Sequence, residues 1–489
     1  MSYKNQKSML KMLFCFIAVG LFSASCKSPN TSKPNVLLIV VDDLGYADMS
    51  CTGQAEDVQT PNIDKLAQTG VRFTQAYATS CICSPARAGI LTGSYQERWG
   101  TFWYGGPGIH DSSYRTIAEI LRENAYATGY IGKVHYGSYD SDTTNRSFPL
   151  NHGFDYFFGH TSPRKHYMIH DQEYEDRFQK IKKENDKWGQ SLRQGSLWKN
   201  KKKIDTLAYS TELFGKEACK FIYNHKDEKF FLQLSFNAVH NFTHQLPEEY
   251  LSQNKLEGYT DWDPAKEEYY DWYVQGRKPN NPEGREHYLG QLYYLDREIG
   301  RVLNQLEKLG LSENTLVVFI SDNGGSTPIY ANNHPLRGSK YLLYEGGIRV
   351  PMIVSYPAKF AGDKILNNVV SGLDILPLIC STTEIPVPEN VDGFDISPIL
   401  SGTNTTIQHD TLVWDSRHEI AVRAGDWKLH IVYDDQNAKY EMVEVELGEH
   451  LYNLTDDPGE TIDLAENFPD KVQALKEFHK KWRNKLLQD

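Results

Sequence analysis

Oxygen-bearing side chains follow two apolar segments that lie far apart in the sequence. Asp42 and Asp43 come directly after the run NVLLIVV, whereas Asp322 and Asn323 come directly after TLVVFIS. If these runs form neighbouring strands, the four side chains converge on one point. Such a set suits a hard cation such as Ca²⁺ or Mg²⁺ and lacks the soft ligands that zinc prefers. Helix capping or turn formation explains either pair alone equally well.

Lysine and histidine side chains follow the ends of other apolar runs. Lys133 and His135 lie in GKVH, His240 lies in NAVH, and Lys340 lies in RGSK. One such residue alone is usually a surface or capping residue. Four of them around an oxygen-ligand cluster would give a doubly charged oxyanion the positive charge that it needs.

A cysteine stands at the expected start of a helix. Cys83 opens the segment CSPARAGILTG, and Arg87 follows one turn later. A helix N-terminus and a nearby arginine both lower the pKa of a thiol, so the pattern predicts a reactive cysteine. A buried structural cysteine is the alternative. The residues alone leave both readings open.

The elements that must position these residues alternate between strands and helices. Continuous β-branched runs are typical of strands buried on both faces of a mostly parallel sheet, and ligands bind beyond the carboxyl ends of such strands. The predicted strands are 35–41, 127–131, 230–236 and 315–321, and the predicted helices are 60–70, 84–92, 116–124, 207–224 and 286–309. Polar segments rich in Tyr and Trp, at 161–206 and 248–285, are expected to be insertions over the sheet edge.

After residue 405 the pattern changes to short alternating strands (411–414, 420–423 and 427–433) and a helix from Asp470. This change predicts a smaller C-terminal α+β subdomain. We therefore divide the chain into a signal peptide, a polar tether, a catalytic domain and a C-terminal subdomain, at 1–25, 26–34, 35–404 and 405–489.

The N-terminal segment has the features of a secretory signal. Three lysines precede a short apolar run, which ends in small residues before Cys26. Cys26 stands where bacterial lipoproteins carry their lipid, so a lipid anchor and simple secretion both remain open. Either reading predicts an exported protein of the periplasm or the cell surface.

Composition excludes several classes of protein. The 489 residues are 40% hydrophobic and 24% charged, with a net charge of −12, which argues against disorder and, without a basic stripe, against a nucleic-acid binder. Five of the seven cysteines come after Cys26. An odd number in an exported protein predicts one thiol with another use, and a Cys51–Cys81 disulfide is one alternative.

The segment from Cys83 to Gly93 resembles the type I sulfatase signature, in which the cysteine is oxidised to formylglycine. The resemblance spans about residues 35–465, where further motifs appear in family order. These are DDLG (42–45), GKVH (132–135), HGFD (152–155), NAVH (237–240), SDNGG (321–325), EGGIRVP (345–351), VRAGDWK (422–428) and LYNL (451–454).

This resemblance implies an alkaline-phosphatase-like α/β/α sandwich that hydrolyses sulfate esters of a polysaccharide or its oligosaccharides. Formylglycine at position 83, made by a separate maturing enzyme, would act as a gem-diol nucleophile. One Ca²⁺ ion would be held by the oxygen-bearing side chains and by residue 83, namely Asp42, Asp43, Cys83, Asp322 and Asn323.

The resemblance also implies roles for the cationic residues. Lys133 and Lys340 would bind sulfate oxygens, and Arg87 would position the diol. His240 would protonate the departing sugar oxygen as a general acid, and His135 would take the proton of the second hydroxyl. Departures from the family pattern at Val134, Tyr136 and Val239 concern the shape of the pocket and not the reacting atoms.

Two further loops are candidates for sugar binding. The loop HTSPRKHYMIH (160–170) supplies His160, Arg164 and His166, and a second set comprises Asn333, His334 and Arg337. The aromatic run WGTFWY (99–104) lies near the nucleophile. We expect aromatic faces against pyranose rings and cations against further sulfate or carboxylate groups; a solvated surface loop is the alternative.

Two other functions compete with this interpretation. A phosphodiesterase or phosphonate monoester hydrolase would share the fold and the aldehyde. The two lysines and the single-metal ligand set favour sulfate. A non-catalytic glycan-binding protein would have lost catalytic residues, and this chain retains all of them.

Overall fold

A computed structural model describes residues 33–136, 142–161, 166–169, 197–257, 266–403 and 409–486. The predictions for the signal peptide and Cys26, and that for Arg164, lie outside these residues. From Lys33 onward the chain forms one compact unit. In the described part of the chain, no helix combines the length and apolar character that crossing a bilayer requires.

A ten-stranded sheet forms the centre, in the order β12-β2-β11-β10-β1-β9-β3-β4-β6-β7. Strand β1 lies between β10 and β9 and is parallel to both, whereas β11 is antiparallel to β10. The expected mostly parallel sheet is therefore confirmed. The strands are β1 (Asn35–Val41), β2 (Val71–Tyr77), β3 (Ala127–Lys133), β4 (Tyr156–His160), β6 (Leu197–Lys199), β7 (Lys202–Ile204), β9 (Phe230–Ser235), β10 (Thr315–Ser321), β11 (Met352–Ser355) and β12 (Lys364–Ser371).

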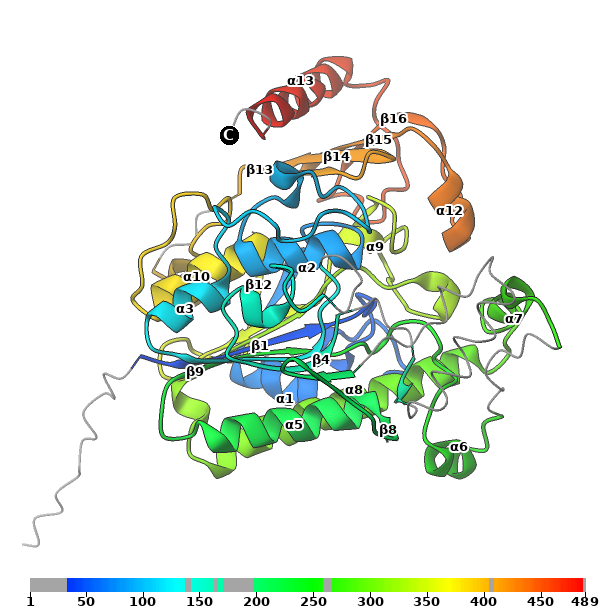
Figure 1. Ribbon diagram of the computed structural model, residues 1–489. Helices are drawn as coiled ribbons and strands as arrows, with labels where there is room; N and C mark the ends of the chain where they lie inside the picture. The colour runs from blue at the N-terminus through cyan, green and yellow to red at the C-terminus, as the bar shows by residue number, and fades with distance from the viewer. Residues whose placement is uncertain are drawn as a thin grey trace, which may run out of the picture. The chain divides into compact units, whose positions relative to one another are not determined.

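Helices cover both faces of this sheet (Figure 1). Alternate side chains of β1 enter two separate cores, with Leu38 in the core beneath α2, α3 and α10 and Ile39 in the core beneath α1, α5 and α8. A strand that must be apolar on both faces reads as a continuous apolar run. The helices are α1 (Pro61–Thr69), α2 (Cys83–Thr92), α3 (Ile117–Glu123), α5 (Ser210–Asn224), α6 (Glu248–Asn254), α7 (Tyr269–Gln275), α8 (Gly284–Lys308), α9 (Glu345–Ile348), α10 (Ile375–Thr382) and α11 (Ser397–Ser401).

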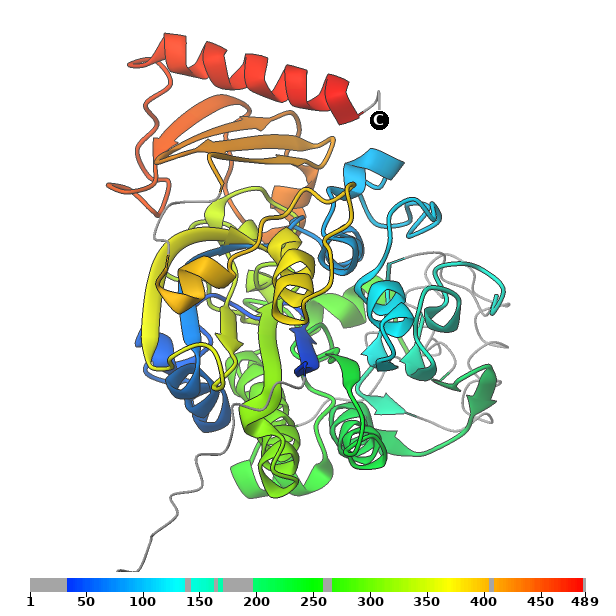
Figure 2. The ribbon, with the colours of Figure 1, turned by 90° about the vertical axis from the view of Figure 1, so that its left-hand side faces the viewer.

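The C-terminal residues form a second, four-stranded antiparallel sheet with α13 (Pro469–Leu486) on one face (Figure 2). Its strands are β13 (Thr411–Asp415), β14 (Glu419–Ala424), β15 (Trp427–Val432) and β16 (Gly448–Asn453), and α12 (Gln436–Glu441) lies between the last two. Val472 and Leu475 of α13 pack on the sheet. The predicted strands and helix are found, and the predicted boundary at 404/405 lies outside the described residues.

Buried polar contacts join the second sheet to the elements around the site. The Lys428 ammonium group lies 3.0 Å from Glu345 Oε1, and the Tyr77 hydroxyl donates to Glu345 Oε2 at 2.7 Å. The Trp414 indole donates to the carbonyl of Ala78, five residues before Cys83, at 2.8 Å. The C-terminal sheet therefore supports the segment that leads into α2.

Two expectations need correction. The predicted helix at 207–224 begins only at Ser210, because residues 208 and 209 form β8 (Ala208–Tyr209), which pairs with β5 (Met168–Ile169). All five described cysteines are unpaired, including Cys51 and Cys81. The odd count therefore does not single out one thiol, since Cys81 is simply buried among apolar side chains.

Candidate active site

The two oxygen-bearing pairs meet at one edge of the sheet. Strands β1 and β10 are parallel neighbours, with Val41 opposite Ser321, so their carboxyl ends lie together. The Asp322 amide donates to the Val41 carbonyl at 3.0 Å, and the Asp43 amide donates to Asp322 Oδ1 at 3.3 Å. The pairs therefore lie side by side, with all four side chains fully buried.

Cys83 is the first residue of α2 and faces this cluster. Its Sγ lies 3.3 Å from Asp42 Oδ1 and 3.7 Å from Asp43 Oδ1. Burial, with added repulsion from Asp322 and Asp42, raises the pKa of the Cys83 thiol well above its usual range. The expectation of a depressed pKa is wrong, because burial and carboxylates outweigh the helix N-terminus. The unmodified thiol is thus a protonated group and a poor nucleophile.

Arg87 fixes α2 against two strand ends. Its Nε donates to Asp322 Oδ2 at 2.7 Å, and its guanidinium also donates to the Lys133 carbonyl at 2.9 Å. The side chain is fully buried between these partners. Arg87 therefore holds the helix that begins with Cys83 in register with the carboxylates.

Two buried lysines bind the first carboxylate pair. The Lys133 ammonium group contacts Asp42 Oδ2, and the Lys340 ammonium group lies 2.8 Å from Asp43 Oδ2. Burial would raise the pKa of Asp42, but the charges of Lys133, His240 and Arg87 hold it well below its usual range. Burial would likewise lower the pKa of Lys340, but the charge of Asp43 keeps it well above its ordinary value. Both groups therefore stay charged.

The two histidines predicted for proton transfer lie at this edge. His135 follows β3 with a positive φ of 49°. Burial, with the charges of Lys133 and Arg87, lowers its pKa well below the usual range, so the imidazole is neutral at pH 7. His240 Nε2 lies 3.6 Å from Asp43 Oδ2. His240 thus borders the same carboxylates as Cys83, and His135 lies two residues after Lys133, which contacts Asp42.

The donor set fits a hard cation. One ligand atom from each of Asp42, Asp43, Cys83 and His240 lies within 4.8 Å of the others. The Asn323 amide nitrogen donates to Asp43 Oδ1 at 2.8 Å, while its buried Oδ1 has no hydrogen-bond partner among the described residues. A buried oxygen left without a donor is available to a metal ion. With Asp322 and Asn323 beside Asp42 and Asp43, four oxygen-bearing side chains lie at this point, and oxygen is the ligand that Ca²⁺ prefers.

Two residues of the predicted sugar-binding sets form side-chain hydrogen bonds to backbone groups. The Asn333 amide accepts from the Gly325 amide at 3.1 Å and donates to the carbonyls of Gly325 and Gly338 at 2.8 and 3.2 Å. Arg337 donates to the Glu460 carbonyl at 3.1 Å. Both side chains are therefore engaged in fixing the loop that carries Lys340.

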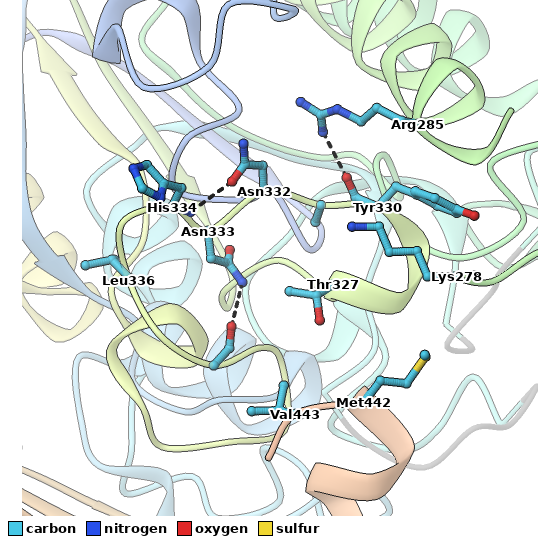
Figure 3. A pocket seen from close by; sticks show the side chains of 12 residues that line it. Lys278, Arg285, Thr327, Tyr330, Asn332, Asn333, His334, Leu336, Met442 and Val443 are labelled. Carbon is cyan, nitrogen blue, oxygen red and sulfur yellow. Dashed lines mark hydrogen bonds between the residues drawn. The ribbon is translucent and has the colours of Figure 1, made fainter. Parts of the chain in front are cut away.

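The other members of these sets differ in exposure. His160 is fully buried in β4, and His166 is buried with its Nδ1 3.0 Å from Gln245 Nε2. His334 is exposed and lines a pocket of about 600 Å³ with Lys278 and Arg285 (Figure 3). None of the catalytic candidates lines this pocket, so His334 belongs to a separate surface depression.

The structure adds positioning residues that the sequence did not single out. The Tyr167 hydroxyl donates to the His240 carbonyl at 2.8 Å. Buried Glu441, the last residue of α12, accepts from the hydroxyls of Ser326 and Ser339, and Ser339 precedes Lys340. No local pattern marks such residues, because their partners lie far away in the sequence.

Comparison with known proteins identifies the family. The chain matches the family model described as Sulfatase over residues 34–385 and that described as N-sulphoglucosamine sulphohydrolase, C-terminal, over residues 338–487. It is 29% identical to N-acetylgalactosamine-6-O-sulfatase of Bacteroides thetaiotaomicron, covering 92% of this chain and 93% of the relative. It is 30% identical to human arylsulfatase A, covering 91% of this chain and 87% of the relative.

Solved structures agree with this match. The crystal structure of Ps i-CgsB in complex with k-i-k-neocarrahexaose has a TM-score of 0.75 and 28% identity, over 92% of this chain and 93% of that chain. The PsFucS1 sulfatase from Pseudoalteromonas sp. has a TM-score of 0.71 and 25% identity, over 93% of this chain and 91% of that chain. The chain therefore belongs to the sulfatase family, and it is an enzyme that hydrolyses sulfate esters.

Proposed function

We propose that this sulfatase removes sulfate from a sulfated polysaccharide or its oligosaccharides, using formylglycine at position 83 and one Ca²⁺ ion. One observation carries the proposal: Cys83 lies buried against Asp42 and Asp43, with Lys133 and Lys340 bound to the same carboxylates. Two similar proteins support a glycan substrate. One is named N-acetylgalactosamine-6-O-sulfatase, and the other was solved in complex with k-i-k-neocarrahexaose.

The residues present fit a Ca²⁺ ion held by Asp42, Asp43, Asp322, Asn323 and residue 83. Such an ion would act as a Lewis acid that polarises a sulfate oxygen. The three carboxylates here are matched by three cations, namely Arg87, Lys133 and Lys340. A divalent ion would therefore give the pocket an excess of positive charge, which favours binding of the sulfate monoester anion.

The side chains divide the proton transfers between them. The aldehyde hydrate at position 83 would supply a nucleophilic hydroxyl for sulfur and a second hydroxyl through which sulfate could be eliminated. Lys133 and Lys340 bind the sulfate oxygens and stabilise the charge that develops there. His240 gives a proton to the departing sugar oxygen, and His135, which is neutral at pH 7, takes the proton of the second hydroxyl.

Export and maturation are part of the same proposal. Formylglycine requires a maturing enzyme that removes the cysteine sulfur and oxidises Cβ to an aldehyde. The signal-like N-terminus supports delivery to the periplasm or the cell surface, with a lipid on Cys26 as the means of retention. Mass spectrometry of the mature N-terminus tests the lipid directly: a processed N-terminus without acyl groups would refute it.

The central test combines peptide mass spectrometry across residue 83 with measurement of released sulfate. We expect natively matured protein to carry an aldehyde or its hydrate at this position and to release sulfate from sulfated glycans. Cys83→Ala should abolish release, whereas Cys219→Ala, a half-buried cysteine on α5, is the matched control. An unmodified thiol in active protein would refute the mechanism.

Comparison of aryl sulfate with aryl phosphate separates sulfatase chemistry from phosphodiester or phosphonate hydrolysis. A metal site with one cation and two lysines should favour sulfate by a large factor in kcat/KM. Equal or better turnover of the phosphate would show that the pocket selects another oxyanion.

A further inference from the structure

Aromatic side chains gather beside the buried lysine at position 340. Tyr341 follows Lys340 directly, and the lysine ammonium group lies 5.3 Å from the centre of its ring. The Tyr341 ring lies 5.8 Å from the ring of Trp103 and 5.8 Å from that of Tyr440. These rings come from the loop after residue 99, the segment between β10 and β11, and α12 of the C-terminal sheet. The three rings are therefore far apart in the sequence and meet only in the folded protein.

Tyr341 is also bound to the segment that precedes Cys83. Its amide donates to the Cys81 carbonyl at 2.9 Å. Burial raises the pKa of the Tyr341 phenol, with Lys340 opposing this rise and Tyr440 and Glu441 adding to it. Because Cys81 lies two residues before Cys83, the amide hydrogen bond holds Tyr341 beside the segment that leads into α2.

The backbone at Tyr341 is held in a costly conformation. Its φ of 71° is left-handed, which for a residue other than glycine costs about 1–2 kcal/mol. Asp43 and His135 share this feature, with φ values of 57° and 49°. The contacts around Tyr341 therefore hold its backbone in this conformation.

The group offers aromatic surface to solvent. Tyr440 is 39% exposed, and Trp103 and Tyr341 are half-buried. The Arg277 guanidinium lies 4.4 Å from the Tyr440 ring, and the His418 ring lies 4.9 Å from that of Trp103. Exposed aromatic surface of this kind suits the apolar face of a pyranose ring.

The aromatic run predicted for sugar binding divides in the structure. Trp99 is only 8% exposed and packs at 4.9 Å on Tyr114, and Phe102 is 9% exposed. Trp103 and Tyr104 are the members of the run that reach the surface. The Trp103 ring contacts the rings of Tyr341 and His418. Any contact of this run with substrate therefore falls to Trp103 and Tyr104.

We propose that Trp103, Tyr341 and Tyr440 form an aromatic subsite that stacks against a pyranose ring of the sulfated glycan beside the catalytic lysine. This inference rests on the proposed function. It makes α12 of the C-terminal region, through Tyr440, part of the substrate-binding surface. It also explains why glycan and small aryl substrates should depend differently on these residues, since a small aryl sulfate fills only the space near the nucleophile.

The test compares Trp103→Ala with Trp103→Phe on two kinds of substrate. The probes are hexasaccharides from chondroitin 6-sulfate and from carrageenan, alongside p-nitrophenyl sulfate. For whichever hexasaccharide the enzyme cleaves, Trp103→Ala should raise KM at least 10-fold with less than a 3-fold change in kcat. The ratio of hexasaccharide to aryl-sulfate kcat/KM should fall at least 5-fold, and Trp103→Phe should restore most of it.

Tyr223→Ala, which removes a 54% exposed aromatic ring from α5, is the matched control and should leave both substrates unaffected. Equal losses on both substrates, or loss of folding without rescue by Trp103→Phe, would mean a structural role and overturn the subsite. An unchanged hexasaccharide KM would overturn it as well while leaving the proposed function intact. Wild-type enzyme that cleaves aryl sulfate but neither hexasaccharide would refute the glycan proposal and the subsite with it.

Discussion

Glu441, the last residue of α12, provides a direct test of whether burial keeps a carboxyl group protonated. Its fully buried carboxyl accepts from the Ser326 hydroxyl at 2.8 Å and from the hydroxyl of Ser339, which precedes Lys340. Its other oxygen, Oε1, has no hydrogen-bond partner among the described residues. Burial, only partly offset by the two serines, raises the pKa of Glu441 to about 7. Glutamine at this position mimics the protonated acid, because its carbonyl can accept from both serines.

The size of the effect follows from proton linkage. The pKa rises from an ordinary value of 4.5 to about 7, and each unit corresponds to about 1.4 kcal/mol, so the full effect is about 3 kcal/mol. Because the folded protein binds this proton more tightly than the unfolded chain, the stabilisation is complete below pH 4.5. It is lost as the pH rises through 7. Glutamine does not ionise, so Glu441→Gln escapes this loss.

The assay is urea unfolding of wild type and Glu441→Gln at pH 5 and pH 8.5, with Glu446→Gln as the exposed control. We expect the stability of Glu441→Gln relative to wild type to increase by about 2–3 kcal/mol between the two pH values. The control should show no such change. A relative stability of Glu441→Gln that is the same at both pH values would refute the argument that burial keeps this carboxyl protonated.

Three further predictions concern the proton donor, the metal and the junction between the sheets. His240→Ala should lower kcat at least 100-fold on a sugar sulfate and far less on p-nitrophenyl sulfate, whose leaving group needs no proton; equal losses would contradict a general acid. EDTA should lower both activity and the melting temperature, and added Ca²⁺ should restore both. Asn323→Leu should weaken the restoration by Ca²⁺. Full activity in EDTA would exclude a required metal. Tyr77→Phe removes a buried hydroxyl that donates to Glu345 and accepts from Arg423, and it should lower the free energy of unfolding by about 1–3 kcal/mol in urea titrations. An unchanged midpoint would show that these two hydrogen bonds do not stabilise the fold.

Local patterns in the sequence predict much of the fold. The runs 35–41 and 315–321 predicted strands buried on both faces, and the structure contains β1 and β10 at those residues. The alternation of strands and helices predicted the mostly parallel sheet. These features depend on residues close together in the sequence, so periodicity and β-branched content reveal them.

The chemistry of the site depended on tertiary structure. Cys83 looked activated from its place at a helix start, yet burial beside Asp42 and Asp322 raises the pKa of its thiol. Asn333 and Arg337 are predicted from the sequence to bind a ligand, yet both side chains donate hydrogen bonds to backbone carbonyls. Local sequence gives the type of a side chain, but its solvation and its partners come from distant segments.

The sequence by itself therefore determined which elements form and which residue types stand at their ends. Only the tertiary structure decided that β1 lies beside β10, so that Asp42 and Asp322 share one edge although about 280 residues separate them. The same holds for Trp103, Tyr341 and Tyr440, whose rings meet from three segments. The physical reason is that strand order and side-chain burial arise from packing of the whole chain, whereas secondary structure reflects interactions between near neighbours.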